Sequence, residues 1–205
     1  MQSPDAYERG GCGGAEYVAV EAEIRHASLT VWMGLLFAVG SACFAGASVV
    51  AQWGSAPVET LAAVYFIGSL FFTTAAAMQF AQGGPGRRAS LIQLAGTIFF
   101  NLSTLHSLQD VQRVDLRVWT PDVFGSVCFL VSSGLAYALV ARVWSRDWWI
   151  AALNLLGSVA FGVSAVASLI EPSTMEPVSA GISNIGTAIG GFCFLAGALL
   201  LLPGD

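Results

Sequence analysis

The sequence contains no lysine, and charged residues of every kind are scarce. They make up 10% of its 205 residues, whereas about a quarter is usual for a soluble domain. Hydrophobic residues make up 56% of the chain, and the mean hydropathy is +0.71. This composition excludes an ordinary water-soluble fold. The eight cationic residues, all arginine, form no basic patch, which excludes nucleic acid as a partner.

Patterns for catalysis and metal binding are missing as well. The sequence has no histidine pair at metal-ligand spacing, no glycine-rich phosphate loop and no nucleophile elbow. The four cysteines lack the spacing of a zinc or redox motif. Three of them, Cys43, Cys128 and Cys193, fall in apolar segments, where a thiol acts as a small apolar side chain. We therefore expect no enzyme activity, no metal and no cofactor.

The charged residues that do occur separate six apolar runs of about 20 residues, the length that crosses roughly 30 Å of hydrocarbon as a helix. The runs cover residues 29–51, 58–80, 89–109, 123–143, 148–170 and 179–202. The sequence therefore predicts an all-α fold, a polytopic membrane bundle of six transmembrane helices that spans residues 27–205. The lipid bilayer is its expected partner, and self-association into a homo-oligomer is left open.

Residues 1–26 precede the first run and hold five carboxylates. Residues 1–14 are rich in glycine and poor in apolar groups, so burial cannot offset the entropy lost on ordering, and we expect disorder there. In residues 15–26, Tyr17, Val20 and Ile24 recur at helical spacing. This pattern predicts a short amphipathic helix on the cytoplasmic surface, docked on the arginine-containing loops.

The arginines are distributed unevenly between the two sides of the predicted bundle. Six of the eight fall in the N-terminal tail and in the second and fourth connections. Short connections that hold arginine tend to stay in the cytoplasm, so we expect both termini there, with the protein in the cell (inner or plasma) membrane. The third connection, residues 110–122, places Val111, Val114 and Val118 at helical spacing. It fits an interfacial helix and a solvated loop equally well.

Every apolar run contains a glycine followed by a small hydroxyl residue. The six pairs are Gly40-Ser41, Gly68-Ser69, Gly96-Thr97, Gly125-Ser126, Gly157-Ser158 and Gly186-Thr187. In five runs a phenylalanine follows four residues after the glycine, whereas Gly190 takes that position in the sixth. Residues i and i+4 share one helix face, so each helix offers a notch beside a large side chain. The pattern is an internal repeat that favours close helix packing.

The repeat unit has two interpretations. The first and fourth runs share Gly-Ser-x-Cys-Phe, and the third and sixth place Gly-Thr after an amide. Three helices followed by three would then have inverted orientations, as in many transporters. The third and fifth runs also align, through Gln93-x-x-Gly96 and Asn154-x-x-Gly157, which favours a two-helix hairpin. The three-plus-three arrangement is our preferred prediction.

Two of these segments, Phe66-Ile-Gly-Ser-Leu-Phe-Phe72 and Asn154-Leu-Leu-Gly-Ser-Val-Ala-Phe161, resemble the glycine-serine-phenylalanine helices of the YrhK-like family of small bacterial membrane proteins. The resemblance extends loosely over the six runs. The unit of that family is a two-helix hairpin, so the resemblance implies several copies of the hairpin or a longer relative. It implies no activity, cofactor or catalytic residue.

No ionisable residue falls deep inside a run, since Glu59, Asp122 and Asp147 stand at predicted helix ends. Uncharged polar residues are more frequent, and they either line a narrow polar pathway or hydrogen-bond across helices and hold the bundle together. The pathway candidates are Gln93, Asn101, Thr104, His106, Asn154 and Asn184. His106 also fits a histidine in contact with water at the outer interface.

Three functions are compatible with these observations. The preferred prediction is a structural or accessory membrane protein. The alternatives are a channel or transporter for a small or uncharged solute, and a membrane sensor that uses the acidic tail. A channel or transporter requires polar residues that converge on a cavity near the middle of the bundle. A sensor requires a tail docked on the cytoplasmic loops.

Overall fold

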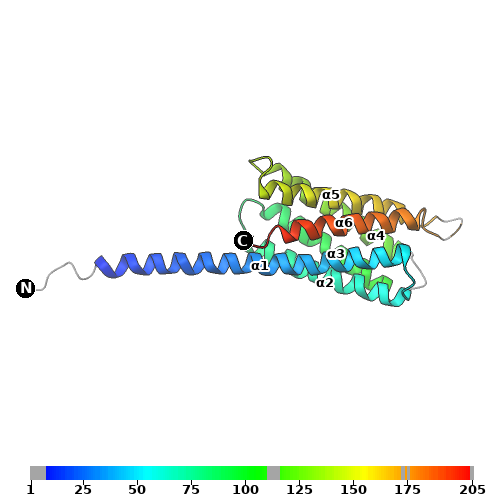
Figure 1. Ribbon diagram of the computed structural model, residues 1–205, viewed down its shortest axis with the longest axis horizontal. Helices are drawn as coiled ribbons and strands as arrows, with labels where there is room; N and C mark the ends of the chain where they lie inside the picture. The colour runs from blue at the N-terminus through cyan, green and yellow to red at the C-terminus, as the bar shows by residue number, and fades with distance from the viewer. Residues whose placement is uncertain (1–7, 110–115, 172–173, 175, 204–205) are drawn as a thin grey trace, which may run out of the picture.

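The computed structural model describes residues 8–109, 116–171, 174 and 176–203, without the side chains of residues 8–16 and 22. The described residues form six α-helices and no β-strand (Figure 1). The helices are α1 (Glu8–Trp53), α2 (Val58–Gln82), α3 (Arg87–Gln109), α4 (Leu116–Ala138), α5 (Arg146–Ala167) and α6 (Ala180–Leu199). All six are long and apolar enough to cross a membrane, which confirms the predicted all-α class and the prediction of six helices of this kind.

The six helices form a closed ring. Each helix packs against the next one along the chain, and α6 packs against α1. The chain reverses between successive helices, so neighbours are antiparallel (Figure 1). We call the end at which α1, α3 and α5 terminate the distal end, and the end from which α1 projects the proximal end.

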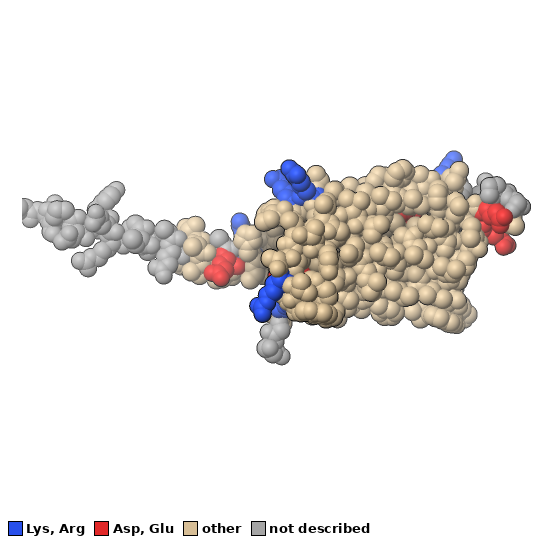
Figure 2. All heavy atoms as spheres, turned by 90° about the horizontal axis from the view of Figure 1, so that it is seen from above, with Lys and Arg blue, Asp and Glu red and all other residues tan. Residues whose placement is uncertain are grey.

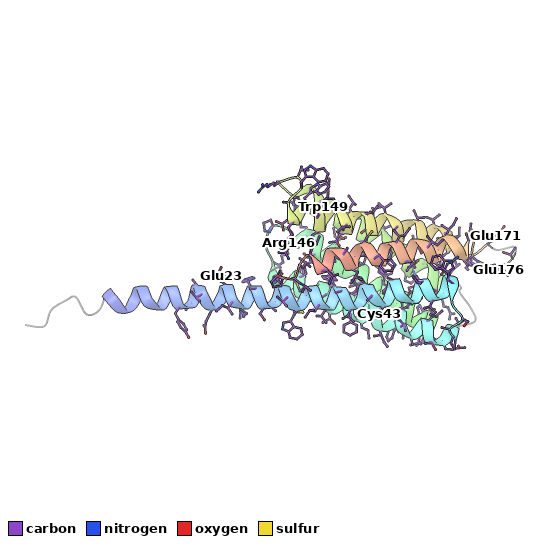
Figure 3. All side chains as sticks on the ribbon, viewed as in Figure 1. Glu23, Cys43, Arg146, Trp149, Glu171 and Glu176 are labelled. Carbon is purple, nitrogen blue, oxygen red and sulfur yellow. The ribbon has the colours of Figure 1, made fainter. Side chains whose placement is uncertain are left out.

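The charged residues gather at the two ends of the bundle. The side of the bundle between the two ends is mostly uncharged in the view of Figure 2. Arg146 and Trp149 lie at the proximal end, whereas Glu171 and Glu176 lie at the distal end (Figure 3). Large apolar side chains such as Leu102, Phe192 and Val163 are exposed on the outer surface of the ring. An apolar belt between two polar ends is the surface that a lipid bilayer requires.

One phenylalanine from each helix fills the centre of the ring. The six residues are Phe44, Phe72, Phe100, Phe129, Phe161 and Phe194. The rings from α1, α3 and α5 form a distal triangle with centroids 5.8 to 6.4 Å apart. The rings from α2, α4 and α6 form a proximal triangle with centroids 5.6 to 6.2 Å apart. We call the two stacked triangles the phenylalanine layer.

The two triangles are joined within each helical hairpin. The centroid distances are 5.6 Å between Phe44 and Phe72, 5.1 Å between Phe100 and Phe129, and 5.2 Å between Phe161 and Phe194. Most of the ring pairs in the layer are edge-to-face, the arrangement that suits the aromatic quadrupole. Every helix therefore contributes one ring to the layer. Successive helices around the bundle contribute their rings to the distal and the proximal triangle in turn.

Glycines bring the two helices of each hairpin close together. A Cβ atom on Gly96 would lie 2.9 Å from the Cβ of Cys128 and 3.2 Å from the carbonyl oxygen of Gly125. The same contacts recur at Gly68, which faces Cys43 and Gly40, and at Gly157, which faces Cys193 and Gly190. The predicted notches are thus real, and in each hairpin a cysteine of the partner helix packs into one of them. The three cysteines are free thiols.

The sixth motif lies one helical turn later than the Gly186-Thr187 pair predicts. Gly190 contacts Gly157 and Phe161, and Phe194 follows four residues later in the phenylalanine layer. The glycine-to-phenylalanine spacing is therefore the same in all six helices. Gly191 replaces the hydroxyl residue in α6, where its Cβ position lies 2.7 Å from the backbone nitrogen of Ala45. A hydroxyl side chain has no room there, because α6 also packs closely on α1.

Helix α1 differs from the predicted tail. It begins at Glu8 and continues without a break to Trp53, so residues 8–14 are helical and residues 15–26 are not a separate surface helix. Beyond the bundle the helix projects freely, with Tyr17 and Ile24 68% and 64% exposed (Figure 1). Glu23 lies on this extension, away from Arg146 (Figure 3). Residues 1–7 lie outside the described part of the chain. The predicted docking on the loops does not occur among the described residues.

Helix α4 also differs from its predicted bounds of 123–143. It begins seven residues earlier, at Leu116, and ends five residues earlier, at Ala138. Residues 116–122 form its first two turns, so this part of the third connection is neither an interfacial helix nor a loop. Residues 110–115, which include Val111 and Val114, lie outside the described range. The change places Asp122 inside a helix that is long enough to cross a membrane.

Candidate functional site

A cavity of about 260 Å³ lies between the helices, on the distal side of the phenylalanine layer. Its floor is the distal triangle of that layer, formed by Phe44, Phe100 and Phe161. Its walls are mostly polar. The polar residues that line it are Tyr65, Ser103, Thr104, Ser107, Asp122, Ser126, Ser164, Ser168, Ser183, Asn184 and Thr187. We call this space the distal cavity.

Helical spacing explains how so many hydroxyl groups face one space. Serines or threonines recur four residues apart in α3, α5 and α6, and a step of four returns to the same helix face. The pairs are Ser103 and Ser107, Ser164 and Ser168, and Ser183 and Thr187. Each pair forms a polar stripe that runs from the phenylalanine layer toward the distal end of the bundle.

Several of these hydroxyls hydrogen-bond across neighbouring helices. The Ser164 hydroxyl lies 2.7 Å from the Thr187 hydroxyl and donates to the carbonyl of Ser183 at 2.8 Å. The Ser69 hydroxyl is 3.0 Å from that of Thr104. Such bonds stabilise helix pairs in apolar surroundings by about 0.6 kcal/mol each on average. The wall is thus both a polar lining and part of the packing of the bundle.

Asp122 carries the one carboxylate among the described residues that line the distal cavity. It lies on α4 one turn before Ser126, and seven residues, or about 10 Å, before Phe129 of the phenylalanine layer. Its carboxylate has no side-chain hydrogen bond or ion pair with another described residue. Ionisable residues inside membrane-spanning helices are costly to bury, which is why they usually have a function.

A proline and a histidine set the local geometry of α4 beside Asp122. Pro121 lies inside the helix and has no N–H, so the carbonyl of Arg117 has no helical donor four residues later. The Nδ1 atom of His106 lies 3.0 Å from that carbonyl oxygen. A carbonyl can only accept, so Nδ1 carries the proton and donates. His106 therefore replaces the backbone hydrogen bond that α4 lacks at Pro121.

A second, smaller cavity of about 70 Å³ lies on the proximal side of the phenylalanine layer. Gln79, Gln93 and Asn154 line it, together with Phe72 and Phe194 of the proximal triangle. The Oε1 atom of Gln79 is buried and has no hydrogen-bond partner among the described residues. No residue lines both cavities, so the phenylalanine layer separates them.

The six predicted pathway residues do not form one continuous path. Thr104 and Asn184 line the distal cavity, and Asn184 also donates to the side chain of Gln52 at 3.3 Å. The proximal cavity holds Gln93 and Asn154. Asn101 lines neither cavity; its side-chain amide donates to the Thr73 hydroxyl at 2.8 Å.

His106 lines neither cavity either, and its ring is bonded to the backbone of α4. Four of the six predicted pathway residues therefore line a cavity, but they divide between the distal and the proximal cavity, which are separate in this structure. Sequence reasoning missed Asp122, because it stood at a predicted helix end. It also missed Tyr65, whose hydroxyl lies 2.8 Å from that of Ser48.

The described residues contain no group of three or more histidine, cysteine, aspartate or glutamate side chains that could hold a metal ion. No family model matches the chain. Searches of the curated proteins and of the solved structures give no match either. What the site can do is therefore inferred from its geometry and chemistry. The arrangement offers a small polar space that reaches the middle of an apolar bundle and stops at an aromatic barrier.

Proposed function

We propose that this chain is a multi-pass protein of the cell membrane that takes a small polar solute into the distal cavity and lets it pass when the phenylalanine layer opens. The distal cavity is the observation that carries this proposal. A bundle whose only role is structural gains nothing from a cavity of about 260 Å³, because empty or wet space forfeits packing contacts. Ligand sites in helix bundles also lie between the helices, as this cavity does.

The phenylalanine layer supports gated passage rather than an open pore. It separates a polar distal cavity from a polar proximal cavity, and apolar constrictions of this kind close a path by excluding water. The sensor alternative has less support, because the α1 extension projects away from the bundle (Figure 1) and its described apolar side chains are exposed.

The chain is further proposed to consist of three helical hairpins that share one internal repeat. The glycine, cysteine and phenylalanine contacts recur at α1–α2, α3–α4 and α5–α6, which supports a two-helix unit over the three-plus-three arrangement. The resemblance to the YrhK-like family implies a unit of the same size. Three such units would account for the triangular symmetry of the phenylalanine layer.

The proposed orientation places the proximal end in the cytoplasm. Arg87, Arg88, Arg142 and Arg146 belong to that end, and arginines in short connections favour the cytoplasmic side. A cysteine introduced at Ser55 should then react with a membrane-impermeant maleimide in intact cells, whereas one at Arg87 should react only after lysis. Each label is read in a variant that lacks the four native cysteines. The opposite pattern would reverse the orientation and turn the distal cavity toward the cytoplasm.

Solute entry into reconstituted vesicles tests the proposed function. Light scattering should record faster re-swelling than in protein-free vesicles after a gradient of glycerol, urea or methylammonium chloride. Ser107→Trp should slow this entry at least several-fold, because the indole ring would occupy the distal cavity.

Leu102→Trp provides the matched control, since Leu102 lies on the same helix and 42% of it is exposed on the outer surface. Entry should be unchanged in that variant. If none of the three solutes enters faster than in protein-free vesicles, or if both tryptophan variants behave alike, the bundle has a structural role and the proposal is wrong.

A further inference from the structure

We infer that the distal cavity is a site for a small organic cation, a primary ammonium compound, held by the carboxylate of Asp122. This inference rests on the proposed function, because it names the class of solute that the distal cavity would take. It follows from three features of the site: a carboxylate without a partner, a lining rich in oxygen acceptors, and an aromatic floor.

The charge on the lining favours a cation. Asp122 lines the cavity, and no arginine, lysine or histidine does. A carboxylate in such a place needs a proton or a positive partner, and the lining of the cavity supplies no positive partner. An anion would meet uncompensated repulsion there, and a neutral solute would leave the carboxylate unpaired. A cation with N–H donors satisfies it directly.

The charges around the distal end point the same way. Among the described residues, the distal connections and helix ends hold Glu59, Asp122, Glu171 and Glu176 against Arg117. Four carboxylates against one arginine give the described part of this end an excess of negative charge. Such an excess raises the local concentration of cations and lowers that of anions near the distal end.

The aromatic floor distinguishes an organic cation from a metal ion. Phe44, Phe100 and Phe161 close the cavity, and Tyr65 and Trp119 belong to its wall. Aromatic faces attract ammonium groups and pack well against alkyl chains. Hard metal cations instead require six or more oxygen ligands around one point, whereas the hydroxyls of this lining run in stripes along three helices and several already bond to one another.

The volume is sufficient for a small organic solute. One water needs about 10–15 Å³ of such space, and the cavity offers about 260 Å³. A cation of a few heavy atoms therefore fits the cavity. Hydroxyls such as Ser126 and Thr187 can accept from the remaining N–H groups while the carbon chain lies against the phenylalanine rings.

Calorimetry on the full-length protein in detergent tests the inference, with butylammonium chloride as the probe. Its neutral isostere 1-butanol, and sodium and potassium chloride, serve as comparison ligands. Butylammonium should bind saturably and raise the melting temperature, and 1-butanol should bind at least about tenfold more weakly, because a hydrogen bond to a charged group is lost. These measurements need only the unmodified protein. If 1-butanol, sodium or potassium binds as tightly as butylammonium does, the assignment is wrong.

Variants locate the site. D122N should weaken butylammonium binding at least about tenfold, whereas D122E, which keeps the charge, should retain most of it. The matched control is E176Q, which removes a distal carboxylate outside the cavity lining and should leave binding unchanged. If E176Q and D122N weaken binding equally, the effect comes from the general field of the distal end, and Asp122 is not the site.

The outcome is separable from that of the proposed function. If glycerol or urea enters vesicles but butylammonium does not bind, the solute is neutral and this inference fails while the proposed function stands. If butylammonium binds through Asp122 but no solute enters, the cavity is a cation-binding site in a protein that does not transport.

Discussion

Gly157→Leu should abolish the folded protein or lower its melting temperature by more than about 10 °C. A Cβ atom on Gly157 would already lie 3.1 Å from the carbonyl oxygen of Gly190 and 3.2 Å from the Cβ of Cys193. The larger leucine would force α5 and α6 apart and separate Phe161 from Phe194. Overpacking in soluble cores costs about 1–3 kcal/mol, occasionally more, and a helix backbone contact leaves little room for relief.

Gly162→Leu is the matched control on the same helix. A Cβ atom there has nothing within 4 Å, so the side chain would extend into open space. Leucine is also a better helix former than glycine, which is about 0.8–1 kcal/mol less favourable than alanine, the best helix former. The control should therefore melt at the same temperature or higher. Thermal unfolding followed by fluorescence-detected size exclusion measures both variants, and an equal loss of stability would show that the glycine contacts do not limit helix approach.

The helices were the most predictable part of this molecule. An apolar run long enough to cross a bilayer must satisfy its backbone internally, so composition alone predicts a helix. The predicted bounds failed where charged residues interrupt a helix without ending it. Arg117 and Asp122 excluded the first turns of α4 from the apolar run. Pro121 does not end the helix there, because His106 supplies a hydrogen-bond donor to the carbonyl of Arg117.

The phenylalanine layer could be foreseen only in part. Sequence spacing shows that a glycine and a phenylalanine share one helix face, but not which neighbouring helix that face meets. In α6 the hydroxyl signature selected Gly186, whereas packing selects Gly190, because Phe194 is the residue that reaches the centre. The choice of hairpins over a three-plus-three arrangement likewise depends on contacts between helices, which a single sequence does not contain.

The distal cavity was the least predictable feature. Its lining comes from all six helices, and most of its polar residues are serines and threonines that also occur as packing residues in membrane helices. Amides, which stand out in an apolar run, were preferred as pathway candidates. They divide between the two sides of the phenylalanine layer because Gln93 and Asn154 lie near the proximal starts of α3 and α5, whereas Asn184 lies near the distal start of α6.

Replacing Phe161 and Phe194 together by alanine should open a permanent path through the bundle. Phe161 lines the distal cavity and Phe194 the proximal one, and their rings are 5.2 Å apart. Removing one ring from each triangle would join two polar spaces that the layer now separates. Re-swelling of reconstituted vesicles in a glycerol gradient should become at least about tenfold faster than with the unmodified protein, since a wet path needs no opening step.

The stability cost limits how this experiment is done. Each Phe→Ala change in a packed core costs about 3–5 kcal/mol, so the pair Phe161→Leu and Phe194→Leu gives a milder version with the same expected direction. Phe192→Ala is the control, because Phe192 lies on the same helix as Phe194 but is 53% exposed on the outer surface. It should change neither the melting temperature nor glycerol entry by much. If a folded double variant admits glycerol no faster than Phe192→Ala does, the phenylalanine layer is a packing core and not the barrier to passage.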